Sequence, residues 1–184
     1  MRVIVGISGA SGAIYGIRLL EELKCLSVES HLVVSAWGAY TVAREQDRPL
    51  DEIKGLASFC YDEKDMAARI SSGSFPVDAM VVAPCSMKTL AGIACGFTDD
   101  LVIRAADVCL KERRKLILVT RETPLSQIHL ENMLAATRAG AMIMPPVPAF
   151  YTRPSSVEEL VNQTVGRILD HLGLPAENLK RWGI

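Results

Sequence analysis

The stretch Arg2-Val-Ile-Val-Gly-Ile-Ser-Gly-Ala-Ser-Gly-Ala-Ile-Tyr-Gly16 decides the fold, because a short β-branched strand breaks into spaced glycines and hydroxyls where a helix begins. A helix N-terminus carries unpaired N–H groups and roughly half a positive charge, and glycines let an anion approach the backbone without a Cβ in the way. The spacing Gly6-x-x-Gly9-x-x-Gly12 differs from the dinucleotide fingerprint G-x-G-x-x-G. It predicts a seat for a phosphorylated small molecule, with a tight strand-to-helix turn as the alternative.

Composition and charge narrow the class of protein. The chain has 184 residues and a formal net charge of −1, so one domain of ordinary size, residues 1–184, fits its length. A nucleic-acid surface or a polybasic membrane face would need clustered excess cation. Five cysteines form no C-x-x-C pair and three histidines form no H-E-x-x-H pattern, so we expect no metal site. The odd number of cysteines suits a reducing compartment.

The N-terminal residues resemble a secretory signal only superficially, because glycines interrupt the apolar run and an amphipathic helix follows it. Ala13, Ile17, Leu20 and Leu23 share one face at helical spacing, which predicts a folded strand-helix unit. No stretch reaches transmembrane length without a charge or a proline. We therefore expect a cytoplasmic protein that engages neither membrane nor nucleic acid.

Apolar strand-like runs recur along the chain, and segments with helical periodicity separate most of them. The runs are residues 3–7, 32–35, 79–83, 116–120 and 142–144. This alternation predicts an α/β fold, a single Rossmann-like (flavodoxin-like) domain with a parallel sheet and helices on both faces. In such sheets ligands bind beyond the carboxyl ends of the strands, so the residues after each strand are the first candidates for chemistry.

Hydroxyl groups and two basic residues, Lys88 and Arg121, lie next to several of these runs. They are Ser8 and Ser11 after the first, Ser35 at the end of the second, the loop Ser71-Ser-Gly-Ser74 before the third, Pro84-Cys-Ser-Met-Lys-Thr89 after it and Arg121-Glu122 after the fourth. One serine-rich loop would mean little, because loops are commonly polar. Several such loops predicted at one sheet edge favour a binding site there.

Two segments could bring charge to an anion. In an apolar helix-like segment, Arg104, Asp107 and Lys111 are neighbours at spacings of three and four residues. They form either an ion-paired stripe exposed to solvent or a cationic wall that Asp107 orients. Arg121 and Glu122 follow a buried strand. Near a phosphate, Glu122 could keep a proton and act as a general acid, although a surface turn would look similar.

Further residues stay ambiguous at this level. The stiff segment Pro145–Tyr151 could hold Tyr151 over a pocket or serve as a linker. Arg167 is more typical of a solvated position, and Trp182 of a packing contact. Two reaction classes lack their residues, because there is no D-D-x-x-D cluster for magnesium-assisted ionisation and no tyrosine with a lysine four residues later, as short-chain dehydrogenases have.

The strongest signal is a set of segments that follow one another along the whole chain. They are Gly6-Ile-Ser-Gly-Ala-Ser-Gly-Ala-Ile-Tyr-Gly16, Ser71-Ser-Gly-Ser-Phe75, Pro84-Cys-Ser-Met-Lys-Thr-Leu90, Arg104-Ala-Ala-Asp-Val-Cys-Leu-Lys-Glu-Arg-Arg114, Arg121-Glu-Thr-Pro-Leu-Ser-Gln-Ile-His-Leu-Glu-Asn-Met133, Pro148-Ala-Phe-Tyr151 and Arg181-Trp182-Gly183. In this order they resemble the UbiX-type flavin prenyltransferases, a family once labelled phenylacrylic acid decarboxylases.

The resemblance implies a reaction and an assembly. A dimethylallyl group moves from its phosphate to N5 of reduced FMN and then bonds to C6, which closes a fourth ring. The prenylated FMN serves a separate UbiD-type decarboxylase. The family works without a metal, and its members are homododecamers with active sites between subunits.

The resemblance also assigns site residues by motif. FMN binding falls to Gly9, Ala10, Ser11, Ser35, Ser86, Met87, Lys88, Thr89 and Arg121. The prenyl phosphate falls to Arg104, Lys111, Arg121, Tyr151 and Arg167, with Glu122 as proton donor, Ser11 and Glu45 near the reacting flavin edge and Trp182 near the prenyl pocket. These roles suit the chemistry, since heterolysis of an allylic C–O bond develops negative charge on phosphate and positive charge on the C5 fragment.

Two other hypotheses stay open. An FMN-dependent decarboxylase of the cysteine-decarboxylase type would need a catalytic histidine, for which His31, His129 and His171 offer no clear candidate. A non-catalytic flavin carrier would have no use for Arg104 and Lys111. The sequence leaves undecided which decarboxylase or pathway uses the product, whether the donor is a monophosphate or a diphosphate, and what reduces FMN.

Overall fold

One parallel sheet organises the chain in a computed structural model that describes residues 1–177 and 179–183. Its strands follow the order β3-β2-β1-β4-β5-β6, which is the Rossmann arrangement. The strands are β1 (Arg2–Ile7), β2 (Glu29–Val34), β3 (Phe59–Tyr61), β4 (Ala79–Cys85), β5 (Lys115–Thr120) and β6 (Met142–Ile143).

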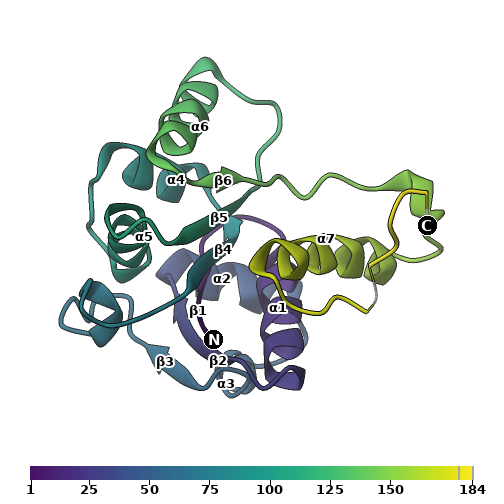
Figure 1. Cartoon of the computed structure of the whole chain (residues 1–184), viewed down its shortest axis with the longest axis horizontal. Helices are drawn as coiled ribbons and strands as arrows, with labels where there is room; N and C mark the ends of the chain where they lie inside the picture. The colour runs from purple at the N-terminus through teal and green to yellow at the C-terminus, as the bar shows by residue number, and fades with distance from the viewer. Residues whose placement is uncertain (178, 184) are drawn as a thin grey trace.

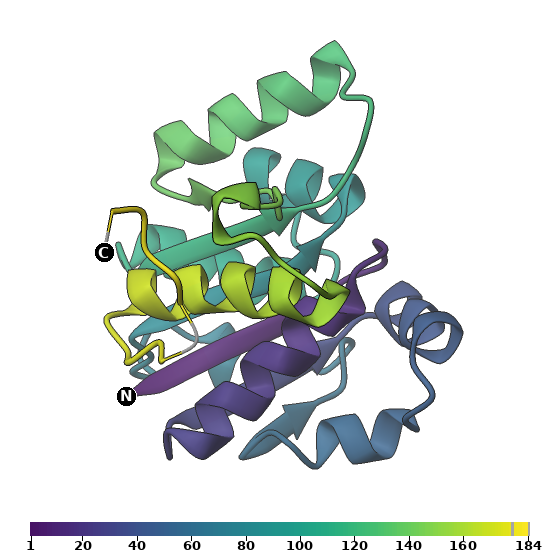
Figure 2. The same ribbon diagram turned by 90° about the vertical axis from the view of Figure 1, so that its right-hand side faces the viewer.

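Helices cover both faces of the sheet (Figures 1 and 2). The helices are α1 (Ala13–Cys25), α2 (Ala36–Glu45), α3 (Leu50–Lys54), α4 (Met87–Cys95), α5 (Leu101–Lys111), α6 (Gln127–Ala139) and α7 (Val157–Leu172), with short 3-10 turns η1 (Arg69–Ser71) and η2 (Phe150–Thr152). Val3, Val5 and Ile7 of β1 pack in the core shared with α1 and α7, whereas Ile4 packs in the core shared with α4 and α5. This alternation follows from the two-residue period of a strand.

The predicted α/β fold with a parallel sheet between two helical layers is confirmed, and all five predicted strands are present within a few residues of their expected bounds. Strand β3 was missed because Phe59–Tyr61 is only three residues long and lies at the sheet edge, largely exposed. No helix among the described residues is long and apolar enough to cross a membrane.

The strand order reverses between β1 and β4. On one side of this point β2 and β3 extend the sheet from β1, and on the other side β5 and β6 extend it from β4. Ser8 joins the two strand ends, because its hydroxyl donates to the Pro84 carbonyl at 2.8 Å and accepts from the Ser86 N–H at 2.8 Å. In open α/β sheets the crevice beside such a switch point is where ligands bind. The topology therefore directs attention to the turns that follow β1 and β4.

An arm projects from this body beyond β6 (Figure 1). Residues 144–156 run outward to η2 and return into α7, and the C-terminal residues come back to the same tip. There Tyr151 and Trp182 meet edge to face, with ring centres 5.3 Å apart. Val147, Phe150 and Trp182 expose more than two thirds of their surface, so the arm carries a group of unburied apolar side chains.

Candidate active site

Two neighbouring cavities open at the carboxyl edge of the sheet, and Glu122 lines both of them. The smaller has a volume of about 540 Å³ and the larger about 710 Å³. Of the residues predicted from sequence, the smaller cavity gathers Gly9, Ser35, Ser86, Met87, Lys88 and Thr89, and the larger gathers Ser11, Glu45 and Arg121. Ala10 lies in the same β1–α1 turn as Gly9 and Ser11.

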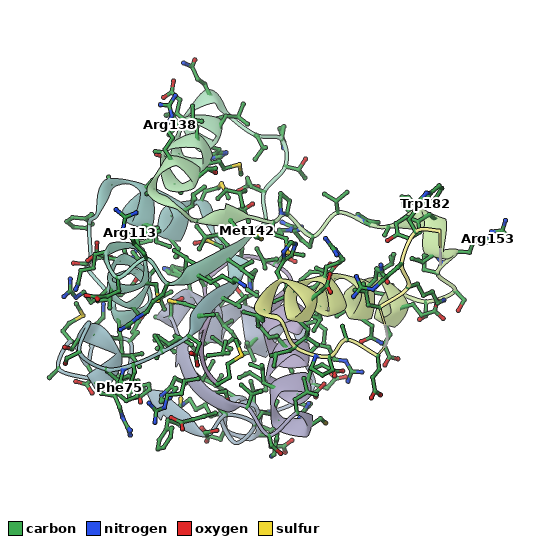
Figure 3. The ribbon with its side chains drawn as sticks, in the orientation of Figure 1. Phe75, Arg113, Arg138, Met142, Arg153 and Trp182 are labelled. Carbon is green, nitrogen blue, oxygen red and sulfur yellow. The ribbon has the colours of Figure 1, made fainter. Side chains whose placement is uncertain are left out.

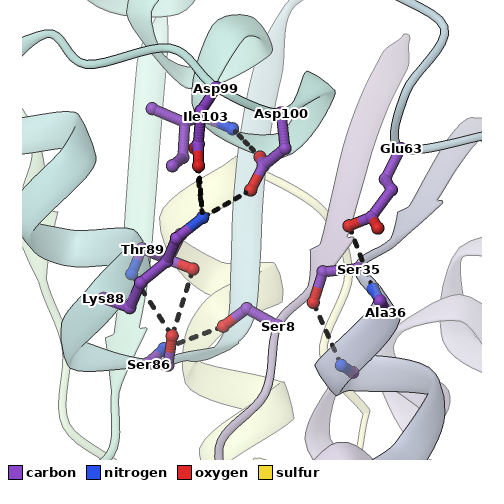
Figure 4. Close-up of polar contacts among 11 residues, drawn as sticks. Ser8, Ser35, Ala36, Glu63, Ser86, Lys88, Thr89, Asp99, Asp100 and Ile103 are labelled. Atoms are coloured by element: carbon purple, nitrogen blue, oxygen red, sulfur yellow. Dashed lines mark hydrogen bonds and ion pairs between the residues drawn. The ribbon is translucent and has the colours of Figure 1, made fainter.

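Three helix N-termini converge around the smaller cavity (Figure 4). Ser35 caps α2 by accepting from the Gly38 N–H, and Ser86 caps α4 by accepting from the Thr89 N–H. Both caps are neutral, so they satisfy backbone donors without cancelling the positive end of the helix dipole. The third helix, α5, is capped by the Asp100 carboxylate, which accepts from the Ile103 N–H at 2.9 Å.

Lys88 is tied to two carboxylates at this cavity. Its Nζ lies 3.0 Å from Asp99 Oδ1 and 3.0 Å from Asp100 Oδ2. Partial burial would lower the pKa of Lys88, but the hydrogen bonds that Lys88 donates to Asp100 and Asp99 outweigh it and raise that pKa. Lys88 is therefore a fixed cation whose charge the chain itself largely neutralises.

The larger cavity combines a cation, an acid and an apolar wall. Arg121 and Glu122 follow β5, and Val157 and Val161 of α7 face them together with the Pro145–Pro148 segment. Burial raises the pKa of the half-buried Tyr15 phenol, which the nearby Arg121 charge only partly opposes. Tyr15 is therefore a neutral hydroxyl at physiological pH, available to donate a hydrogen bond into the cavity.

The α1 N-terminus, which the glycine spacing predicted as a phosphate seat, is filled by the chain's own carboxylate. Glu45 Oε2 accepts from the backbone N–H of Gly12 at 2.8 Å and from that of Ala13 at 3.1 Å. An anion that used these donors would have to replace Glu45. The α4 N-terminus, which the neutral Ser86 caps, is a second candidate anion seat at this edge of the sheet.

The cationic stripe of α5 does not reach either cavity within one chain. Arg104 donates to Asp107 at 2.8 Å and to the Ser71 carbonyl at 3.1 Å, and Lys111 pairs with Glu112. Asp107 therefore orients Arg104 but not Lys111. The contact between Arg104 and Asp107 is an ion pair of the kind that their helical spacing allowed.

The serine loop that precedes β4 lies at the opposite edge of the sheet from the two cavities, which corrects the expectation that it joins them. The Gly73 carbonyl accepts from the Arg114 guanidinium at 2.7 Å, and Arg114 directly precedes β5. A loop that leads into a strand lies at that strand's amino end. Lys111 lies beside this loop, since a Cβ at Gly73 would come within 2.6 Å of its Nζ.

Tyr151, Arg167 and Trp182 also lie outside the two cavities. The Tyr151 hydroxyl accepts a hydrogen bond from the Gln163 amide at 3.2 Å. The Tyr151 ring packs on Trp182 at the tip of the arm. Arg167 pairs with Asp170 at 2.7 Å on α7. In Figure 3, Trp182 at the arm tip and Arg113, two residues beyond Lys111, lie on opposite sides of the molecule. One chain therefore cannot gather all the residues assigned to the prenyl phosphate.

Several cavity residues were not found from the sequence. Glu63 and Lys64 come from the loop after β3, and Trp37 and Tyr15 from α2 and α1. Asp100 carried a usable signal, because an aspartate directly before an apolar helical run is typical of an N-cap. Within residues 1–177 and 179–183, no group of three or more His, Cys, Asp or Glu side chains is placed to hold a metal ion.

Comparison with known proteins gives close relatives over nearly the whole chain. The Flavoprotein family matches residues 1–169. The mitochondrial flavin prenyltransferase PAD1 of Saccharomyces cerevisiae is 59% identical over 181 residues, which cover 98% of this chain and 75% of the yeast protein.

Solved structures agree with this relationship. AnUbiX (PadA1), crystallised in complex with FMN and dimethylallyl pyrophosphate, is 54% identical with a TM-score of 0.98, covering 100% of this chain and 97% of its own. A dodecameric FMN-dependent UbiX-like decarboxylase from Escherichia coli O157:H7 is 51% identical with a TM-score of 0.98, covering 100% of both chains. The peptidyl-cysteine decarboxylase EpiD is 16% identical with a TM-score of 0.68, over 93% of this chain and 97% of its own, and shares the fold alone.

Proposed function

Since the chain belongs to the Flavoprotein family and, within it, to the UbiX-type flavin prenyltransferases, we propose that it transfers a dimethylallyl group from dimethylallyl phosphate to N5 and C6 of reduced FMN. The product, prenylated FMN, serves a UbiD-type decarboxylase in this proposal. Residues 1–184 act as one flavoprotein domain in the cytoplasm, without a metal, a membrane or a nucleic acid.

The smaller cavity fits a phosphorylated flavin. The neutral Ser86 cap and the first N–H groups of α4 provide the kind of anion seat that phosphates occupy at helix N-termini. Gly9 lets Trp37 of α2 pack directly on the β1–α1 turn at this cavity, since a Cβ at Gly9 would lie 2.3 Å from Trp37 Cβ. In the proposal FMN is held by Gly9, Ala10, Ser11, Ser35, Ser86, Met87, Lys88, Thr89 and Arg121.

The larger cavity fits the prenyl donor. When bound, reduced FMN supplies the electron-rich N5 and C6 positions that accept the C5 group. Arg121 stabilises the negative charge that develops on the leaving phosphate, and Glu122 donates a proton to it. Val157 and Val161 exclude water from the C5 chain, while Ser11 and Glu45 lie near the reacting flavin edge in this proposal.

The phosphate end of the site needs a second copy of the chain. Arg104 and Lys111 carry charges suited to a phosphate but lie away from the cavities of their own chain. In a homododecamer, as in the dodecameric relative, a neighbouring copy brings Arg104 and Lys111 to the donor phosphate. Tyr151 and Arg167 complete the phosphate contacts and Trp182 borders the prenyl pocket in the assembled state.

The observation that carries the proposal is the position of Glu122, which lines the cavity with the anion seat and the cavity with Arg121. An acid at this junction lies within reach of a phosphate ester in the larger cavity. The ester's allylic carbon is then directed toward a flavin in the smaller cavity. This arrangement matches transfer between two reactants, not storage of one.

Mass spectrometry of an anaerobic reaction tests the function. The purified protein is incubated with reduced FMN and dimethylallyl phosphate, and the released flavin is analysed for the mass of one added C5 unit. We expect a prenylated flavin in excess over enzyme, with Glu122→Gln as the inactive control. Recovery of unmodified FMN alone would support the carrier hypothesis, and CO2 release from a cysteinyl peptide would support the decarboxylase.

A further inference from the structure

Glu63 occupies the α2 N-terminus inside the smaller cavity. Its Oε2 accepts from the backbone N–H of Ala36 at 2.9 Å, from a position 27 residues away in the chain (Figure 4). The loop that carries it is anchored from behind, because the Glu63 carbonyl accepts from the Leu101 N–H at 2.8 Å. The carboxylate is thus held against a helix end that would otherwise offer an open donor to an anion.

The charge balance of this cavity makes that carboxylate consequential. Five ionisable residues line it, three acids and two lysines. Lys88 already pairs with Asp99 and Asp100. The other lysine of the lining, Lys64, forms no ion pair with a carboxylate among the described residues. A phosphate that enters meets the free α4 N-terminus on one side and the negative charge of Glu63 on the other.

We propose that Glu63 competes with the FMN phosphate for the helix ends of this cavity and so sets how readily the flavin is released. The proposal rests on the function given above, in which FMN is a reactant that must leave after each turnover. A flavoprotein that retains its cofactor benefits from every contact that strengthens phosphate binding. A transferase, in contrast, turns over more slowly when its product stays bound. Glu63 weakens phosphate binding through its charge and through its occupation of the Ala36 N–H.

The role predicts a phosphate-specific effect. FMN and riboflavin share the ring and the ribityl chain and differ in the phosphate, so their affinity ratio isolates the phosphate contribution. In Glu63→Gln the charge is lost but an acceptor oxygen remains. We expect that variant to bind FMN about threefold to tenfold more tightly, as expected for removal of one nearby like charge in partly exposed surroundings. Riboflavin affinity stays unchanged.

The experiment is a titration of both flavins by fluorescence at low and high salt. A second variant, Glu63→Ala, also frees the Ala36 N–H, so we expect its FMN affinity to equal or exceed that of Glu63→Gln. Asp51→Asn is the matched control, because it removes one negative charge from a side chain that is 93% exposed and lies outside both cavities. The gain in FMN affinity shrinks at high salt, and the rate at which excess FMN displaces prenylated FMN falls in both Glu63 variants.

Two outcomes overturn the proposal and are distinguishable. In the first outcome, the wild-type chain binds FMN, but the FMN-to-riboflavin affinity ratio of the Glu63 variants equals that of the wild type or of Asp51→Asn. This result would exclude the role of Glu63 and leave the proposed function standing. A wild-type chain that binds no FMN removes both.

Discussion

Glu45 caps the N-terminus of α1, with its Oε2 2.8 Å from the nitrogen of Gly12, the residue that precedes the helix. The residue is at the C-terminal end of α2, so this contact also fixes α2 against the β1–α1 turn. The glycine-rich turn is therefore held by an internal anion on the larger-cavity side. On the smaller-cavity side the turn presents Gly9 to the anion seat of α4.

Replacing Glu45 tests this contact. We expect Glu45→Ala to lower the free energy of unfolding by about 1 kcal/mol, the usual effect of losing a helix cap and a charge near the helix N-terminus. Glu45→Gln, which keeps an acceptor, loses less. Chemical denaturation measures both, and equal stability of Glu45→Ala and wild type would contradict the capping role.

Glu122 is expected to matter for chemistry and not for flavin binding. Glu122→Gln keeps the shape of the side chain but has no acidic proton, so prenyl transfer should fall by about 10²–10⁴-fold, the range for loss of a general acid. FMN affinity should stay close to that of the wild type. Single-turnover kinetics and a flavin titration separate the two effects, and Glu131→Gln, an exposed acid on α6 that lines neither cavity, is the control.

Mixed assemblies test the shared site. Lys111→Ala and Glu122→Gln are each expected to be inactive, because one lacks the phosphate cation and the other the proton donor. When the two variants are assembled together, a site regains both groups if its Glu122 chain is the Lys111→Ala variant and its neighbour is the Glu122→Gln variant. Random mixing gives a half times a half, so activity returns to about one quarter of wild type. Mixtures as inactive as their parents would place both groups in one chain.

His31 is expected to make stability depend on pH. It is fully buried, with Nδ1 2.9 Å from the Tyr61 hydroxyl and Nε2 3.0 Å from Glu29, and Arg2 and Arg69 lie nearby. Burial lowers its pKa below the ordinary 6.5, against the opposing effect of Glu29. The folded state therefore binds fewer protons than the unfolded state below that value.

The stabilising effect of neutral His31 is complete above pH 6.5 and is lost as the pH falls toward its lowered folded-state pKa. We expect the midpoint temperature of thermal unfolding to decrease as the pH is lowered from about 7 to about 5. In His31→Gln this decrease should be smaller. The hydrogen bond that Glu29 accepts from His31 lowers the pKa of Glu29. Protonation of Glu29 therefore causes a separate loss of stability at lower pH. A variant with the wild-type slope between pH 7 and 5 would contradict the role of His31.

Local patterns predicted what lies close along the chain. Ser35 and Ser86 follow apolar strand-like runs and were therefore predicted at the carboxyl edge of the sheet, and they lie together at one cavity. The same reasoning placed the Ser71–Ser74 loop at the wrong edge, because it precedes β4 instead of following it. The direction of the chain through a strand, not the composition of a loop, decides which edge a loop joins.

Contacts between distant segments could not be predicted in this way. Glu63 reaches Ala36 across 27 residues and Glu45 reaches Gly12 across 33, and nothing in the surrounding sequence marks either pair. On α5 the helical spacing correctly joined Arg104 to Asp107, but Lys111 turned to its chain neighbour Glu112. Spacing restricts which residues can meet, whereas the rotamer of a long side chain decides which of them do.

In the proposed assembly, the projecting arm makes the stability of the fold depend on protein concentration. Phe150 and Trp182 leave 72% and 79% of their surface in water in a single copy, together with Val147 and Tyr151 nearby. Association that covers these side chains involves only folded chains. By mass action, the melting temperature therefore rises with protein concentration. A dilute preparation is thus the fragile one, and stability values for this chain are comparable only at matched concentration.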